Sequence, residues 1–293
     1  MIEQGASGSE RRLSSHDRRL LWGCLLIAAL SLAIGFYLFP RVNPEASIQF
    51  KVDRRASEAL ARALIERVGA LPAGSKHASN FTYDDETKVF LERNLGVEQS
   101  NALLGGELHA WRWSHRWFRP LQKEEWRVDV ATTGEVVGFD HLIEEEASGP
   151  ELAQDSARVV AERFLSQELK LDPAGLEFLD AKSERHPHRV DHSFTWKVRG
   201  AAWAGSDYRR EVRVQGSEVG AYREYLKVPD AWRRDYQKLR SHNDGAAAVA
   251  AAFLFLTVGA AVVVLLQRFR LGDVRWSTAS VFAGIGVVLT ILA

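Results

Sequence analysis

The chain has almost no cysteine, because Cys24 is the only one among its 293 residues. A single thiol excludes an intramolecular disulfide and any zinc site built from several cysteines. A domain of this chain exported from the cytoplasm must therefore be stabilised by core packing. Nine Trp and fourteen Phe supply ample apolar surface for it.

Net charge is also absent, since Lys plus Arg and Asp plus Glu both number 38. This balance gives no reason to expect a nucleic-acid partner. The sequence has no nucleophile-elbow motif and no phosphate-binding glycine loop, because its clearest G-x-G run, at Gly284 and Gly286, lies in an apolar block. We therefore assign no catalytic residue and no cofactor-binding residue.

Three long apolar blocks interrupt the charged sequence, at 20–39, 245–266 and 277–293. The first has about the 20 residues that span the hydrocarbon core of a bilayer. A cleaved signal peptide and a lipoprotein are the alternatives for this block. It lacks a small-x-small cleavage pattern, and Cys24 stands at its start beside the bulky Trp22, so an uncleaved anchor is favoured.

Arginines flank these blocks on the sides that we expect to be cytoplasmic. Arg18 and Arg19 precede the first block, and Arg268 and Arg270 lie between the second and third. The positive-inside rule then predicts a multi-pass protein of a bacterial cytoplasmic membrane, with a cytoplasmic N-terminus and residues 41–244 outside. The third block ends at the lower length limit for a span, so we expect a fragment of a longer protein.

The stretch 109–143 alternates with a period of two and predicts an antiparallel sheet. One strand carries an aromatic face, 126–130 forms a second strand, and 136–143 returns as a third after a turn at Gly134. Cross-strand ion pairs are expected between two groups of charges, Arg112, Arg116 and Arg119 on one side and Glu124, Glu125 and Asp129 on the other.

The order of a helix followed by a sheet occurs twice, and 128–139 matches 212–222, with Gly138 aligned to Gly220. We predict an α+β fold: a tandem helix-plus-antiparallel-sheet extracytoplasmic domain flanked by transmembrane α-helices. The predicted parts are a cytoplasmic tail 1–19, a transmembrane helix 20–40, a first α+β unit 41–147, a second unit 148–230, a juxtamembrane helix 231–244, a transmembrane helix 245–267, a cytoplasmic loop 268–276 and a truncated transmembrane helix 277–293.

Two clusters of side chains are candidate sites. A ligand face is one hypothesis for the aromatic strand, and packing of the same face against helices of its own unit is the alternative. Imidazoles and a carboxylate also gather at 186–192, where a polar surface loop is the simpler interpretation, so no metal site is assigned. The ligand-face residues are His109, Trp111, Trp113, His115 and Trp117, and the cluster comprises His186, His188, Asp191 and His192.

The basic, aromatic stretch 232–239 precedes the second apolar block. It predicts a helix that rests on the lipid interface, where Trp and Tyr are favoured. A solvated, charged linker helix is the alternative. In either case the expected partner is the bilayer, with a peptide or a membrane-protein substrate as a further partner.

The helix-then-sheet order and the final hairpin resemble PepSY-type modules. The segments 116–130, 192–200 and 220–243 further resemble the N-terminal region of CPBP-family (CAAX-protease and bacteriocin-processing) intramembrane metalloproteases. This resemblance implies a metalloendopeptidase whose catalytic helices, and their divalent metal, with zinc as first choice, follow residue 293.

The family motif Glu-Glu-x-x-x-Arg is not present. Asp129 stands at the arginine position after Glu124-Glu125, and the three apolar blocks contain no His, Asp or Glu. Two hypotheses follow: this chain is the sensing or substrate-handling head of such a protease, or it is a stand-alone membrane-tethered binding module.

Overall fold

The computed structural model describes residues 15–42, 45, 48–271 and 276–292. The chain divides into two units, residues 1–228 and 229–293. Most of the predicted tail 1–19 and residues 272–275 of the predicted loop lie outside the described residues. The helices are α1 (Ser15–Val42), α2 (Arg54–Val68), α3 (Asp85–Leu95), α4 (Val97–Leu104), α5 (Gln154–Arg163), the π-helical η2 (Phe164–Glu168), the 3-10 helix η3 (Pro173–Gly175), α6 (Asp230–Arg270) and α7 (Trp276–Leu292).

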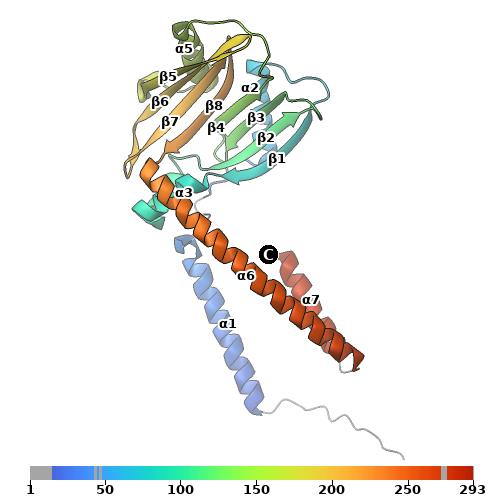
Figure 1. The fold of residues 1–293 in the computed structure, drawn as a ribbon. Helices are drawn as coiled ribbons and strands as arrows, with labels where there is room; N and C mark the ends of the chain where they lie inside the picture. Colours follow the sequence, from blue (N-terminus) through green and yellow to red (C-terminus); the bar gives the residue numbers. More distant parts are fainter. Residues whose placement is uncertain (1–14, 43–44, 46–47, 272–275, 293) are drawn as a thin grey trace, which may run out of the picture. The chain divides into compact units, whose positions relative to one another are not determined.

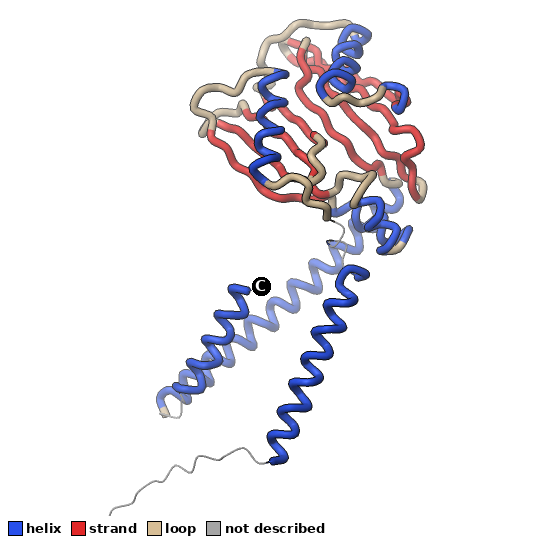
Figure 2. Tube along the Cα trace, turned by 180° about the vertical axis from the view of Figure 1, so that it is seen from behind, coloured by secondary structure: helices blue, strands red, loops and turns tan. Residues whose placement is uncertain are grey.

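Eight antiparallel strands form one sheet in the order β1-β2-β3-β4-β8-β7-β6-β5 (Figure 1). Helices α2 and α5 cover one face of this sheet, and no other helix among the described residues of the first unit covers its other face (Figure 2). The predicted α+β class is therefore confirmed. The strands are β1 (Lys76–Tyr83), β2 (Trp111–Phe118), β3 (Glu125–Ala131), β4 (Val136–Leu142), β5 (Leu176–His186), β6 (Arg189–Trp203), β7 (Ser206–Gln215) and β8 (Glu218–Lys227).

The sheet consists of two repeats joined at their last strands. The first repeat runs from α2 through β1, β2 and β3 to β4, and the second runs from α5 through β5, β6 and β7 to β8. Strands β4 and β8 pair over only three residue pairs, which we call the seam. The last hairpin of each repeat contains a register shift, after Asp129↔Gly138 in one and after Arg213↔Ala221 in the other. Gly138 therefore corresponds to Ala221, and the predicted match of Gly138 to Gly220 is wrong by one residue.

Both repeats bury a helix face with the same spacing. In α2 the buried positions i, i+4, i+7 and i+8 begin at Ser57, and in α5 and η2 they begin at Ala157. This spacing places one stripe of each helix against the sheet. Phe164 lies between Phe139 of β4 and Tyr222 of β8, with ring centroids 6.1 and 5.9 Å away, so a single core extends beneath the seam.

The core of the first repeat contains a polar chain that the second repeat lacks. Ser57 Oγ lies 2.9 Å from His115 Nε2, and His115 Nδ1 lies 3.1 Å from His77 Nε2. Ser57 and His115 are fully buried, and burial followed by the charge of His77 lowers the pKa of His115 to about 4. By helix spacing and strand register, the second repeat has apolar residues at these three positions, namely Ala157, Phe194 and Phe178.

Strands β1 and β5 were not predicted from the sequence, and both lie at the edges of the sheet. β1 reads KHASNFTY and β5 reads LEFLDAKSERH, and neither alternates cleanly between apolar and polar residues. Helix α5 begins without a side-chain cap, because Ala153 precedes it. In contrast, Asp53 is the N-cap of α2, and its side chain accepts hydrogen bonds from the backbone at the start of the helix.

Helices α1 and α6 are long and apolar enough to cross a membrane, with apolar windows of mean hydropathy 2.1 and 2.8. The stretches predicted as a juxtamembrane helix and a transmembrane helix belong to one continuous α6. In α6, the rings of Trp232 and Tyr236 stack with centroids 4.9 Å apart. Helix α7, with 17 residues, is shorter.

The polar chain predicts a pH-dependent stability. Because the folded pKa of His115 is depressed to about 4, the unfolded chain binds a proton that the folded chain excludes as the pH falls below about 6.5. The free energy of unfolding should therefore decrease between pH 6.5 and 4, by at most ~3 kcal/mol from this residue. The double variant S57A/H115F, which installs the residues of the second repeat, should lose this decrease. Urea denaturation in detergent at several pH values measures the free energy of unfolding. If this free energy depends on pH in the same way in both proteins, His115 is not the cause of the decrease.

Gly69 follows α2 where a side chain would strike Trp126. A Cβ added there would lie 2.4 Å from Cη2 of this buried ring, which stacks on His141 at 3.6 Å. We expect Gly69→Ala to destabilise the fold by ~1–3 kcal/mol through overpacking. Gly175→Ala is the matched control, since nothing lies within 4 Å of the position that its added methyl group would occupy. Chemical denaturation of both variants measures the difference, and equal stabilities would refute the predicted clash.

Candidate functional site

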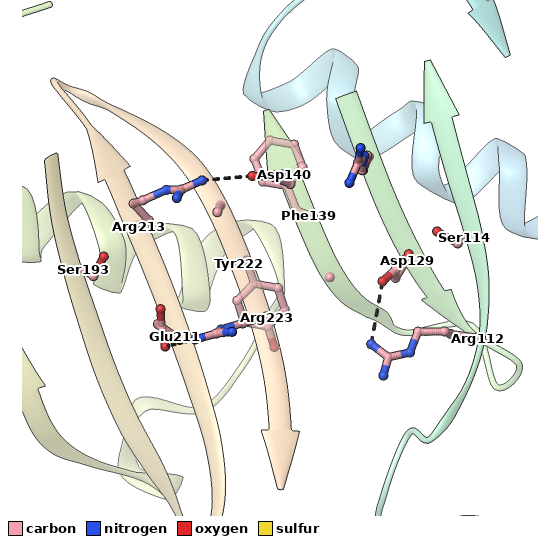
Figure 3. Close-up of a pocket in the computed structure, with 13 residues that line it drawn as sticks. Arg112, Ser114, Asp129, Phe139, Asp140, Ser193, Glu211, Arg213, Tyr222 and Arg223 are labelled. Atoms are coloured by element: carbon pink, nitrogen blue, oxygen red, sulfur yellow. Dashed lines mark hydrogen bonds and ion pairs between the residues drawn. The ribbon is translucent and has the colours of Figure 1, made fainter. Parts of the chain in front are cut away.

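A charged groove of about 530 Å³ crosses the seam on the face of the sheet opposite α2 and α5 (Figure 3). Strands from both repeats contribute to it, because alternate residues of each strand point to this face. It is lined by Arg112, Ser114, Arg127, Asp129, Gly138, Phe139, Asp140, Ser193, Glu211, Arg213, Ala221, Tyr222 and Arg223.

Small residues form the floor of the groove. Gly138 and Ala221 occupy equivalent positions beside the seam, and Ser114 and Ser193 occupy equivalent positions opposite Asp129 and Arg213. A Cβ at Gly138 would lie 3.1 Å from Cβ and Oδ2 of Asp129, so glycine lets that carboxylate lie across the strand. The depression therefore arises from short side chains between longer charged ones.

The walls carry opposite charges at equivalent positions of the two repeats. The registers align Arg127 with Glu211 and Asp129 with Arg213. Asp140 likewise corresponds to Arg223, because Asp140 pairs with Arg127 and Arg223 pairs with Glu211. At three equivalent positions, the two walls thus carry charges of opposite sign. A ligand that crosses the seam therefore meets the reversed pattern of charges on the second wall.

Ion pairs organise these walls. Arg213 and Asp140 pair across the seam at 3.0 Å, and Arg223 pairs with Glu211 at 2.8 Å (Figure 3). Burial raises the pKa of Asp140, although the charge of Arg213 opposes this shift. Pairs as exposed as these contribute only ~0–1 kcal/mol each, so they hold side chains in place more than they stabilise the fold.

The arginines of the groove retain free hydrogen-bonding capacity. Four arginines and three carboxylates line the groove, and one of these arginines, Arg127, also pairs with Glu125 outside it. The Nε–H groups of Arg112 and Arg213, on opposite walls, are buried without a hydrogen-bond partner. Arg112 is 3.7 Å from Asp129, a distance that leaves its guanidinium able to bind another acceptor. The groove can therefore accept anionic groups from both sides.

The predicted cross-strand ion pairs are present. Arg119 lies 2.9 Å from Glu124, and Glu125 pairs with Arg116 and also with Arg127. Sequence analysis found these charges because they alternate along adjoining strands. It did not find the groove, because the residues that complete it come from β6, β7 and β8, and nothing in a local pattern shows that β4 pairs with β8.

The predicted ligand face lies on the other side of the sheet. Trp111, His115 and Trp117 are buried, with exposed fractions of 3% or less, whereas His109 and Trp113 are half-buried. Trp113 donates to Val52 O at 3.2 Å. Three of the five residues therefore pack in the core, and ligand binding by this face remains a prediction.

The side chains of His186 and His192 bond to the protein itself. His186 Nε2 lies 3.1 Å from Asp191, whose carboxylate also pairs with buried Arg189 at 3.0 Å. Arg189 in turn donates to three carbonyls of the loop between the repeats, each at 2.9 Å. His192 bonds to Ser183 and to Leu152 O. Within the described residues this cluster fixes the inter-repeat loop.

Comparisons with known proteins give little further information about this chain. No family model and no curated protein matches the chain. Among solved structures, the Bacillus megaterium YpeB C-terminal domain matches with 11% sequence identity and a TM-score of 0.35, over 60% of this chain and 64% of that one. The match spans less than two thirds of that chain and carries no argument about function. Nothing in these comparisons supports the resemblance to CPBP proteases.

Proposed function

We propose that this protein is a membrane-tethered binding module whose seam groove holds a charged, extended polypeptide segment. The observation that carries this proposal is the convergence of charged side chains from both repeats over a floor of Gly138, Ala221 and two serines. A groove this open suits a chain that passes through it better than a small molecule that must be enclosed. Guanidinium groups on both walls favour carboxylates along that chain.

The connections of the head support a membrane hairpin. The backbone N–H groups of Lys51 and Val52 donate to Thr132 O in the β3–β4 turn, at 2.9 and 3.0 Å. Strand β8 runs antiparallel to β4, so its last residue, Lys227, lies toward that same end of the sheet. A domain inserted between two membrane helices needs both connections at one end. We infer that residues 41–244 lie outside the cytoplasm and that α1 and α6 cross the bilayer.

The protease-head hypothesis is the more specific proposal, and it depends on the sequence resemblance alone. In that case the groove would present a peptide or membrane protein to catalytic helices elsewhere in the complete protein. Tethering raises the local concentration of such a substrate without tight binding. Cleavage of a membrane-protein substrate by the complete gene product, and its loss when the head is deleted, would support it.

A reporter inserted at Gly205 tests the topology. This exposed residue has a positive φ of 81° in the turn between β6 and β7, and it can accept an insertion without disturbing the core. Alkaline phosphatase inserted there should be active, and green fluorescent protein exported through the Sec pathway should stay dark. The opposite result would place the head in the cytoplasm and refute the proposed topology.

Exchanging Arg213 and Asp140 tests the groove. The variant R213D/D140R keeps the net charge and the cross-seam ion pair but reverses which wall is positive. We expect it to weaken binding of acidic 12-residue peptides at least tenfold, because the arginine leaves its place beside Ser193. Titration of the full-length protein in nanodiscs with a panel of acidic, basic, mixed and neutral peptides measures this change.

Lys182→Glu is the matched control, since Lys182 is 82% exposed on edge strand β5 and does not line the groove. It should bind the same peptides as the original chain. If no peptide of the panel binds, or if the exchange and the control behave alike, the seam groove is not the binding site.

A further inference from the structure

A second groove, of about 520 Å³, lies on the helix-bearing side of the sheet, beside the β3–β4 turn. Leu60 of α2, Val136 of β4 and Leu169 and Leu171 of the segment after η2 give it apolar walls. Its polar end is formed by His109, Arg210 and Glu224. It lies on the opposite side of the sheet from the seam groove, and Tyr222 borders both.

The polar end is a buried network held by one carboxylate. Glu224 is 7% exposed, and its oxygens lie 2.5 Å from His109 Nδ1 and 3.1 Å from the Tyr222 hydroxyl. Burial alone would raise the pKa of Glu224, but the hydrogen bond and charge of His109, with Arg210, lower it. Burial likewise opposes a protonated His109, and Glu224 more than offsets it, so the pKa of His109 is raised. Each group therefore favours the charged form of the other.

The first repeat shows how the chain closes the equivalent space. The registers align Arg210 with Trp126 and Glu224 with His141. In the first repeat, Trp126 stacks on His141 at 3.6 Å and reaches Gly69, filling the volume. In the second repeat a guanidinium replaces the indole, and the groove remains. Burying a charged cluster costs more free energy than burying an aromatic pair at the same position. We therefore expect this cluster to have a function.

The backbone beside the groove is also irregular. Residues 164–168 form a π-helical turn, whereas the matching end of α2 stays α-helical. Lys170 has a φ of 56°, a left-handed conformation that a non-glycine residue seldom adopts. Both features are enriched at ligand sites. They place Gln167, Glu168 and Lys170 along one wall of the groove.

The unoccupied donors of this groove are cationic. Both oxygens of Glu224 already have partners, and Arg67 pairs with Glu168 at 2.7 Å. The Nε–H of Arg210 makes no hydrogen bond, although this nitrogen lies 3.4 Å from Glu224 Oε2, and Lys170 is exposed. Three basic side chains and His109 face three carboxylates in this groove. An anion is thus the missing partner, and the leucines and Val136 suit an aliphatic body attached to it.

We propose that this second groove binds a carboxylate attached to an aliphatic body, with the carboxylate at Arg210 and Lys170 and the body between Leu60 and Leu171. Glu224 acts as the counter-ion that positions Arg210 and His109. Two sources have this chemistry, the C-terminus of a peptide that ends in aliphatic residues and a short fatty acid.

Calorimetric titration of the full-length protein in nanodiscs tests the proposal with three probes. N-acetyl-Leu-Leu with a free carboxylate should bind, and its C-terminal amide should bind at least tenfold more weakly. Hexanoate is the third probe, and tighter binding of hexanoate than of the dipeptide acid would identify a fatty acid as the source. Equal binding of acid and amide, or no binding of any probe, would overturn the proposal.

Two variants locate the binding. Leu60→Trp should fill the apolar part of the groove and reduce affinity for the acid at least tenfold without touching the charged network. Lys170→Gln should reduce it severalfold, and because Lys170 is exposed the fold should not depend on its charge. Val159→Trp, at a 54% exposed position of α5 outside this groove, is the matched control and should bind normally.

The seam variant R213D/D140R separates this inference from the proposed function. It should retain affinity for the dipeptide acid while losing the acidic peptides. If Leu60→Trp binds the acid as the original chain does, the probe binds elsewhere and the proposal fails.

Discussion

The pairing of β4 with β8 is the interaction on which the rest of the structure depends. Only three residue pairs join the two four-stranded repeats along this seam. Backbone pairing of that length is weak by itself, and the core beneath it supplies the stabilisation. Phe164 packs between Phe139 and Tyr222, one from each side of the seam, so that the two repeats share apolar burial. Without this shared core the sheet would be two separate halves.

Both grooves owe their positions to the seam. On the bare face, short side chains flank it and charged ones rise on either side. On the helix-bearing face, α2 packs over β2 and β3 while α5 packs over β6, β7 and β8, and Val136 of β4 borders the second groove between the two helices. The second groove forms where Arg210 leaves part of that space unfilled. Binding surfaces that lie between repeats are formed by neither repeat alone.

Sequence reasoning reached the class of fold because period-two alternation in 109–143 and 208–228 is strong. It also reached the ion pairs of β2 and β3, whose partners are neighbours along one hairpin. It missed β1 and β5 because an edge strand is half exposed on both faces, which removes the alternation. It could not find the grooves, since Arg213 and Asp140 meet only through the β4–β8 pairing, and no local pattern encodes a contact between residues so distant in the chain. The aromatic strand drew attention as a ligand face, although its largest rings serve the core.

The reversed charges of the repeats follow from how they are joined. If the second repeat kept the residues of the first, position 213 would carry the aspartate found at 129, and that carboxylate would face Asp140 across the seam. Like charges at this distance would repel and weaken a junction of only three residue pairs. Arginine at 213 converts the repulsion into a 3.0 Å ion pair. The same reversal occurs on the helices, where Glu58 and Arg62 correspond to Arg158 and Glu162. Because their charges are opposite, the two repeats pair with each other more favourably than two copies of the same repeat would. The same reversal gives the seam groove two walls of opposite charge pattern.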